Sequence, residues 1–65
     1  MSEGFYKEVV AELTRLGYAR VKGGKGSHEK WAGKPDDPLL IIPHNLKSRH
    51  TANGILKDAG SPVKL

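Results

Sequence analysis

Residues 18–32 read YARVKGGKGSHEKWA, a pattern that predicts two β-strands joined by a glycine-rich turn. Residues 18–22 alternate apolar and polar side chains with the period of two that a half-buried strand shows. Glycine dominates residues 23–26, where the chain has to turn, and residues 27–32 then form a second strand. The stretch therefore predicts two adjacent strands with a cationic turn between them.

The alternation also predicts which side chains of these strands share a face. In the first strand we expect Ala19 and Val21 to point into the core. The residues expected to point outward are Tyr18, Arg20 and Lys22. In the second strand, if Trp31 faces the core, His28 and Lys30 share the opposite face.

An amphipathic helix is predicted on each side of the strands. Residues 3–16 carry apolar side chains at helical spacing, with Ser2 as a plausible N-cap and Gly17 at the C-terminal cap. The last helix begins after Ser48 and ends at Gly60. Its apolar face is formed by Ala52, Ile55, Leu56 and Ala59. Gly54 lies inside this helix at a cost of about 1 kcal/mol relative to alanine, which predicts a close contact there.

The element order determines the fold class. Residues 33–38 are rich in turn-forming residues, and residues 39–42 are a short apolar strand stopped by Pro43. The order α-β-β-β-α predicts an α+β fold with a three-stranded antiparallel sheet and two helices on one face. We expect residues 1–65 to form a single domain.

Composition narrows the classes of function. The 65 residues contain no cysteine, which excludes disulfides and thiolate metal sites. The N-terminus lacks the pattern of a signal peptide, and no apolar run approaches the roughly 18 residues of a membrane span. We therefore expect a cytoplasmic protein with no membrane partner.

The positive charge is concentrated rather than scattered. The net charge is +4, with 11 Lys and Arg against 7 Asp and Glu. Residues 20–34 carry a cationic side chain at positions 20, 22, 25, 30 and 34, and Glu29 is the acidic residue among them. This concentration around glycine turns favours a phosphate-bearing partner.

The turn of residues 22–28 has the residue types that phosphate chemistry requires. Glycines let the backbone approach a phosphate closely, while Lys22 and Lys25 supply charge. His28 comes directly after this turn, and histidine is the residue type that ordinarily changes its charge near neutral pH. We expect any catalysis to occur here. For a lone histidine the ordinary alternative is a strand residue without a chemical role.

A second basic patch opens the last helix. Lys47, Arg49 and His50 surround Ser48, at a helix N-terminus whose free N–H groups favour anions. Capping of the helix by the Ser48 side chain is compatible with anion binding at the same N-terminus.

A metal site is disfavoured by the histidine spacing. His28, His44 and His50 are 16 and 6 residues apart, unlike the close ligand pairs of zinc sites. Glu29, the acid adjacent to His28, should point to the opposite face of its strand. Asp36 and Asp37 are expected to be turn residues. We expect no metal and no cofactor.

Three segments together resemble the HicA family of bacterial toxins. They are GSH at residues 26–28 after the lysine-rich turn, IPH at residues 42–44, and KSRHTANGILKDAG at residues 47–60. They occur in the family's order, and the resemblance covers nearly the whole chain. Asn53 and Gly54 depart from the stronger helix formers expected at this point in the family.

The resemblance implies a metal-independent endoribonuclease that cleaves mRNA and is neutralised by a HicB-like antitoxin. It implies a fold like that of double-stranded RNA-binding domains, and it makes His28 the catalytic histidine. The residues expected to bind RNA are Lys22, Lys25, Gly26, Ser27, Lys30, Lys47, Arg49 and His50. His50 and Lys22 are both candidates for a second acid–base group. The alternative functions are a non-catalytic RNA-binding module of the same fold and a protein-interaction domain for an acidic partner.

Overall fold

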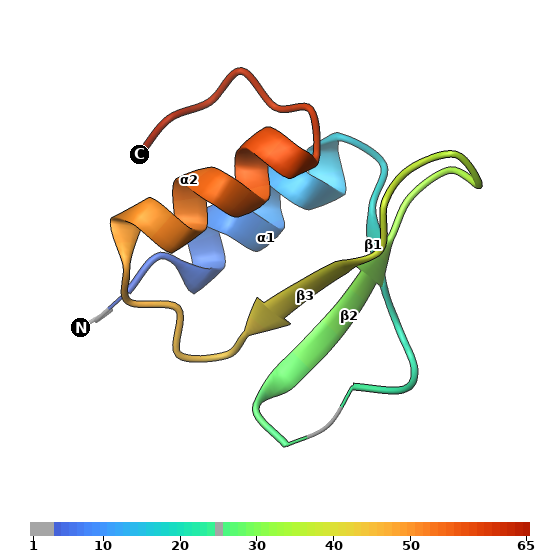
Figure 1. Ribbon diagram of the computed structural model, residues 1–65, viewed down its shortest axis with the longest axis horizontal. Coiled ribbons are helices and arrows are strands. Elements are labelled where there is room, and N and C mark those ends of the chain that lie inside the picture. Colours follow the sequence, from blue (N-terminus) through green and yellow to red (C-terminus); the bar gives the residue numbers. More distant parts are fainter. Residues whose placement is uncertain (1–3, 25) are drawn as a thin grey trace.

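The computed structural model describes residues 4–24 and 26–65, and its elements follow the order α-β-β-β-α. They are α1 (Tyr6–Arg15), β1 (Ala19–Val21), β2 (His28–Ala32), β3 (Leu40–Pro43) and α2 (Arg49–Asp58). The two helices run beside each other, with the hairpin of β2 and β3 next to them (Figure 1). The predicted α+β fold class is confirmed.

The sheet has the strand order β1-β2-β3, and both strand pairs are antiparallel. In the register, Arg20 lies opposite Trp31, and Trp31 lies opposite Leu40. His28 lies opposite Pro43 at the other end of β2. Because cross-strand partners point to the same face, these pairs define a helix-facing side and an outer side of the sheet.

The core lies between the helices and the inner side of the sheet. Its buried apolar residues are Val9, Leu13, Tyr18, Trp31, Leu40, Ile42, Leu46, Ala52, Ile55 and Leu56. The helical periodicity predicted the buried positions of α1 and α2 because each helix buries one stripe.

The prediction for the faces of β1 is wrong. Val21 pairs with Lys30 on the outer side and is 39% exposed, and Ala19 is exposed as well. Tyr18 is the residue that enters the core, held where its backbone N–H donates to the Leu13 carbonyl at 2.9 Å. Alternation shows which side chains share a face, but the turn after α1 determines which face is covered.

The first helix is shorter than predicted. It begins at Tyr6 instead of residue 3. The Phe5 backbone, with φ of −110° and ψ of 10°, is not helical, and its N–H donates to the Leu46 carbonyl at 2.7 Å. Phe5 is the N-cap, without a side-chain capping bond. The predicted cap Ser2 lies outside the described residues. Gly17, with φ of +99°, confirms the predicted turn after the helix.

The predicted ends of the last helix are confirmed. The Ser48 hydroxyl accepts a hydrogen bond from the Thr51 N–H at 3.2 Å, and Gly60 has a φ of +82° after the helix. The close contact expected at Gly54 is wrong, since a Cβ at this exposed position would meet no atom of the described residues within 4 Å. The second strand begins one residue later than predicted, at His28, and ends at Ala32 as predicted. The third strand is displaced by one residue, since β3 runs from Leu40 to Pro43.

Candidate nucleic-acid interface

The glycine-rich turn folds back on the start of β2. His28 is the first residue of this strand, is exposed, and follows Gly26, whose φ is +57°. A Cβ at Gly24 would collide with the carbonyl oxygen of His28. Glycine is therefore required where the turn contacts the backbone of the candidate catalytic residue. Lys25 lies outside the described residues.

Lys30 joins His28 on the outer side of the sheet, as predicted. Gly23 has a φ of +112°, and a Cβ at that position would lie 3.3 Å from Nζ of Lys30. The half-buried Lys30 therefore extends its ammonium group over the glycine turn. In the described part of the chain it has no acidic partner. A hollow of about 350 Å³ adjoins the turn, lined by Arg20, Val21, Lys22, Gly23, Gly24 and Glu29.

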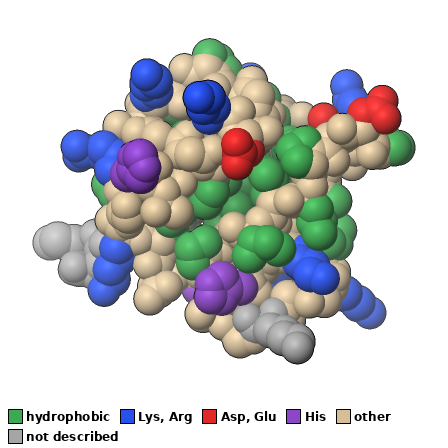
Figure 2. Space-filling view, viewed as in Figure 1, with side chains coloured by type: hydrophobic (Ala, Val, Ile, Leu, Met, Phe, Trp, Pro, Cys, Tyr) green, Lys and Arg blue, Asp and Glu red, His purple; other side chains and the backbone are tan. Residues whose placement is uncertain are grey.

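The second basic patch occupies the start of α2. Lys47, Arg49 and His50 are all exposed there, and the Arg49 guanidinium lies over the Phe5 ring, 5.8 Å from its centre. The first turn of α2 and the start of β2 lie at different sides of the molecule (Figure 1). In the space-filling view, Lys and Arg side chains stand at separated points around the outline (Figure 2). The fold keeps the two basic patches apart, with His28 and His50 in different patches.

Glu29 is a buried charged residue that was not among the predicted site residues. Its side chain is 2% exposed on the inner side of the sheet. The Tyr6 hydroxyl donates to its two oxygens, at 2.8 and 3.0 Å. Nε1 of Trp31 donates to Oε1 at 3.0 Å, and Nε2 of His44 contacts Oε2. The Arg20 guanidinium lies 3.8 Å from the same carboxylate.

These contacts explain how a carboxylate is tolerated in the interior. Burial by itself raises the pKa of Glu29. The hydrogen bonds from Trp31, Tyr6 and His44 and the charge of Arg20 outweigh burial, so the pKa lies below its ordinary value and the carboxylate stays ionised. Glu29 thereby ties α1, β1, β2 and the segment after β3 together at one end of the sheet.

One signal in the sequence pointed to this arrangement. Glu29 and Trp31 are two residues apart on a strand, so a core position for Trp31 also turns Glu29 inward. The partners Tyr6 and His44 are distant in sequence and give no such signal. His44 lies beside the glycine turn, since its backbone N–H donates to the Ser27 carbonyl at 2.6 Å.

The described residues hold no group of three His, Cys, Asp or Glu side chains that could bind a metal ion. Asp37 has the turn role expected for it, accepting a hydrogen bond from the Lys34 N–H at 2.9 Å. Neither helix in the described part of the chain is long and apolar enough to cross a membrane.

Two comparisons with known proteins identify relatives. Residues 6–61 match the family described as the HicA toxin of bacterial toxin-antitoxin systems. The chain belongs to the HicA toxin family. A solved structure, a toxin-antitoxin complex from Streptococcus pneumoniae, is 41% identical with a TM-score of 0.73. The similarity covers 83% of this chain and 91% of that one. No match was found among curated proteins.

The HicA match spans the glycine turn, the buried carboxylate and the second basic patch. The range 6–61 contains the glycine turn with His28, the buried Glu29, and the patch at the start of α2. The observed element order agrees with the fold, similar to double-stranded RNA-binding domains, that the resemblance implied.

Proposed function

We propose that this HicA-family chain is an endoribonuclease toxin that cleaves mRNA, with His28 as its catalytic histidine. The observation that carries the proposal is the exposed position of His28 at the start of β2, directly after the glycine turn. Lys30 shares its sheet face and extends over the same turn. A proton-transfer group and a cation are thus adjacent on an accessible surface.

RNA supplies its own nucleophile. The 2′-oxygen attacks phosphorus while its proton is removed, the bond from phosphorus to the 5′-oxygen breaks, and the 5′-oxygen takes up a proton. His28 performs one of these two proton transfers, because an imidazole nitrogen can accept or donate a proton. Cationic groups on the turn, Lys22 and Lys30, stabilise the negative charge on the phosphoryl oxygens. This mechanism needs no metal ion.

In this proposal, residues of the glycine turn and of both basic patches bind the RNA backbone. The phosphate-binding set is Lys22, Lys25, Gly26, Ser27, Lys30, Lys47, Arg49 and His50. Lys22 and His50 remain candidates for the second acid–base group, with Lys22 on the same turn as His28. The site of action would be the cytoplasm, where mRNA is translated.

A HicB-like antitoxin would neutralise the toxin. The support is the relative described as a toxin-antitoxin complex, together with the basic surface around His28. Charge complementarity steers an acidic partner to such a surface and increases its association rate.

The test replaces His28 with alanine. Loss of one positioned acid–base group should reduce RNA cleavage by about 10²- to 10⁴-fold while thermal unfolding stays close to that of wild type, because the side chain is exposed. Lys34→Ala is the control for loss of an exposed basic side chain outside the proposed site, and its effect should be much smaller. A folded His28→Ala protein that still cleaves RNA would exclude the assignment. RNA binding without cleavage in wild type would indicate the non-catalytic module instead.

A further inference from the structure

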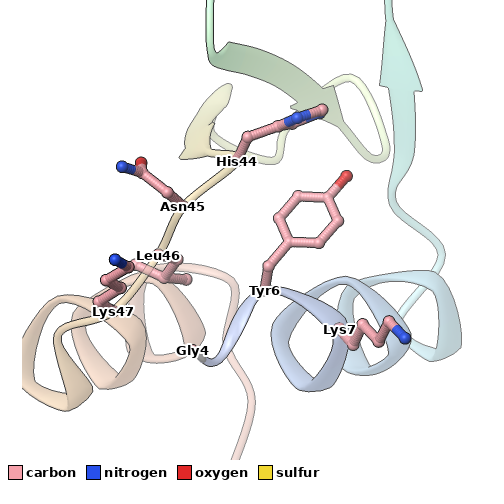
Figure 3. Close-up of a pocket in the computed structure, with 7 residues that line it drawn as sticks. All are labelled: Gly4, Tyr6, Lys7, His44, Asn45, Leu46 and Lys47. Carbon is pink, nitrogen blue, oxygen red and sulfur yellow. The ribbon is translucent and has the colours of Figure 1, made fainter. Parts of the chain in front are cut away.

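A pocket lies between the start of α1 and the segment that joins β3 to α2. It has a volume of about 220 Å³ and is lined by Gly4, Tyr6, Lys7, His44, Asn45, Leu46 and Lys47. Figure 3 shows the Tyr6 and His44 side chains converging from the two walls. The hydrogen bond from Phe5 N–H to the Leu46 carbonyl holds the walls together at 2.7 Å.

The two aromatic walls are fixed by the buried carboxylate beneath them. The Tyr6 hydroxyl and Nε2 of His44 both bind Glu29, and their rings meet edge to face with centres 5.1 Å apart. His44 is nevertheless 56% exposed, so its ring keeps a surface open to a ligand. Rings that are already oriented lose little conformational entropy when a flat group binds against them.

The pocket is cationic at its rim. Lys7 and Lys47 lie on opposite walls, and among the described residues no acidic side chain lines the pocket. Lys47 forms no ion pair with any carboxylate in residues 4–24 and 26–65. Lys47 is therefore available to pair with a phosphate attached to a group bound in the pocket.

The pocket lies next to the proposed catalytic residue. His44 donates its backbone N–H to Ser27, the residue before His28. By ordinary strand geometry the Cα atoms of His28 and His44 are about 6 Å apart. Their side chains belong to opposite sides of the sheet, so a strand of RNA passing over this end of the sheet would reach both. An RNA strand that runs from the turn before His28 to Lys47 of the second basic patch would pass over the pocket.

We infer that this pocket binds one nucleotide of single-stranded RNA next to the cleaved phosphate, with its base against His44 and Tyr6 and a phosphate near Lys47. The inference rests on the proposed function and names a subsite for its substrate. Pockets for drug-sized ligands occupy about 300–1,000 Å³, so about 220 Å³ suits a single nucleobase. Proteins that recognise single-stranded RNA commonly stack bases on aromatic or histidine side chains.

The test measures RNA binding without cleavage. In a His28→Ala background, a single-stranded oligoribonucleotide of mixed sequence is titrated against further variants. His44→Ala should weaken binding by about 5- to 150-fold, the range that loss of one base–aromatic contact produces. Lys47→Ala should weaken it as well. Lys34→Ala is the matched control, because it removes an exposed lysine from the 33–38 turn, and its effect should be clearly smaller.

His44→Phe separates stacking from support of the fold. Phenylalanine keeps a flat ring but cannot bind Glu29, so this variant should restore most of the affinity that His44→Ala loses. Equal losses in His44→Ala and His44→Phe would show a structural role and overturn the inference. Unchanged RNA affinity in both would also overturn it, and loss of antitoxin affinity alone would assign the pocket to the antitoxin.

The outcomes also distinguish this inference from the proposed function. If wild type does not cleave RNA but His44→Ala still reduces RNA affinity, the catalytic proposal fails and the nucleotide subsite stands. If cleavage depends on His28 while His44→Ala leaves the oligoribonucleotide affinity unchanged, the subsite fails and the catalytic proposal stands.

Discussion

Two tyrosine hydroxyls in this protein have opposite surroundings. The Tyr6 hydroxyl donates to the ionised Glu29, at 2.8 and 3.0 Å from its two oxygens. The Tyr18 hydroxyl is buried and has no hydrogen-bond partner within the described residues. Burial raises the pKa of both phenols, so both stay neutral near pH 7. The difference between them is therefore one of hydrogen bonding rather than charge.

Removing each hydroxyl should have a different effect on stability. Tyr6→Phe should lower the free energy of unfolding by about 1.5–3 kcal/mol, the usual contribution of a hydrogen bond to a charged group. Tyr18→Phe should leave it unchanged or raise it by up to about 1 kcal/mol, because an unsatisfied buried hydroxyl is lost. Urea unfolding of both variants measures the two changes in the free energy of unfolding. Equal destabilisation by the two substitutions would mean that Tyr18 has a partner or that the Glu29 contacts contribute little.

At the scale of elements, two glycines show how the same residue type serves different purposes. Gly24 is required in the turn before β2, since a Cβ there would collide with the His28 carbonyl. Gly54 has a helical position in α2 with open space around it. The turn therefore needs glycine for its close backbone approach, whereas nothing in the fold explains the glycine in α2.

Alanine substitutions should separate these two roles. Gly54→Ala should raise the free energy of unfolding by about 0.5–1 kcal/mol and leave RNA cleavage unchanged, because alanine favours the helix. Gly24→Ala should lower both stability and cleavage, because the turn must move away from His28. Thermal unfolding and an RNA cleavage assay on both variants provide the comparison. Full cleavage by Gly24→Ala would show that the position of the turn does not affect His28.

At the scale of the whole molecule, the helices cover one side of the sheet and leave the other open. Val21, Lys30 and Ile41 form a row across the open side, and His28 lies on the same side next to Pro43. Val21 is 39% exposed and Ile41 is 48% exposed. The proposed catalytic residue therefore lies on an apolar and cationic surface, which suits a protein partner as well as RNA.

We expect the antitoxin to bind this surface and exclude RNA. Ile41→Asp should weaken antitoxin binding, because it places a charge where apolar contact is expected. Val63→Asp is the matched control, since Val63 is 37% exposed on the C-terminal segment, away from the sheet. Binding competition between RNA and antitoxin measures the exclusion. A stable complex of toxin, antitoxin and uncut RNA would show that inhibition does not occur by covering His28.

The helices and strands and their order could be predicted from the sequence, because periodicity, turn residues and caps act within a few residues of one another. The sequence also identified the glycine turn and the two basic patches, and the family motif around His28. Each of these features is formed by residues that are close together in the sequence, so it can be recognised without the structure. The bounds of the helices and strands moved by only a few residues in the structure.

The covered side of β1 and the assembly of the end of the sheet could not be read from the sequence. The exposure of Val21, the burial of Tyr18 and the meeting of Tyr6, Glu29 and His44 depend on strand register and on how α1 packs. Contacts between residues 15 or 23 positions apart leave no periodic signal in the chain. These contacts form because a buried carboxylate requires hydrogen-bond donors, which the surrounding elements supply.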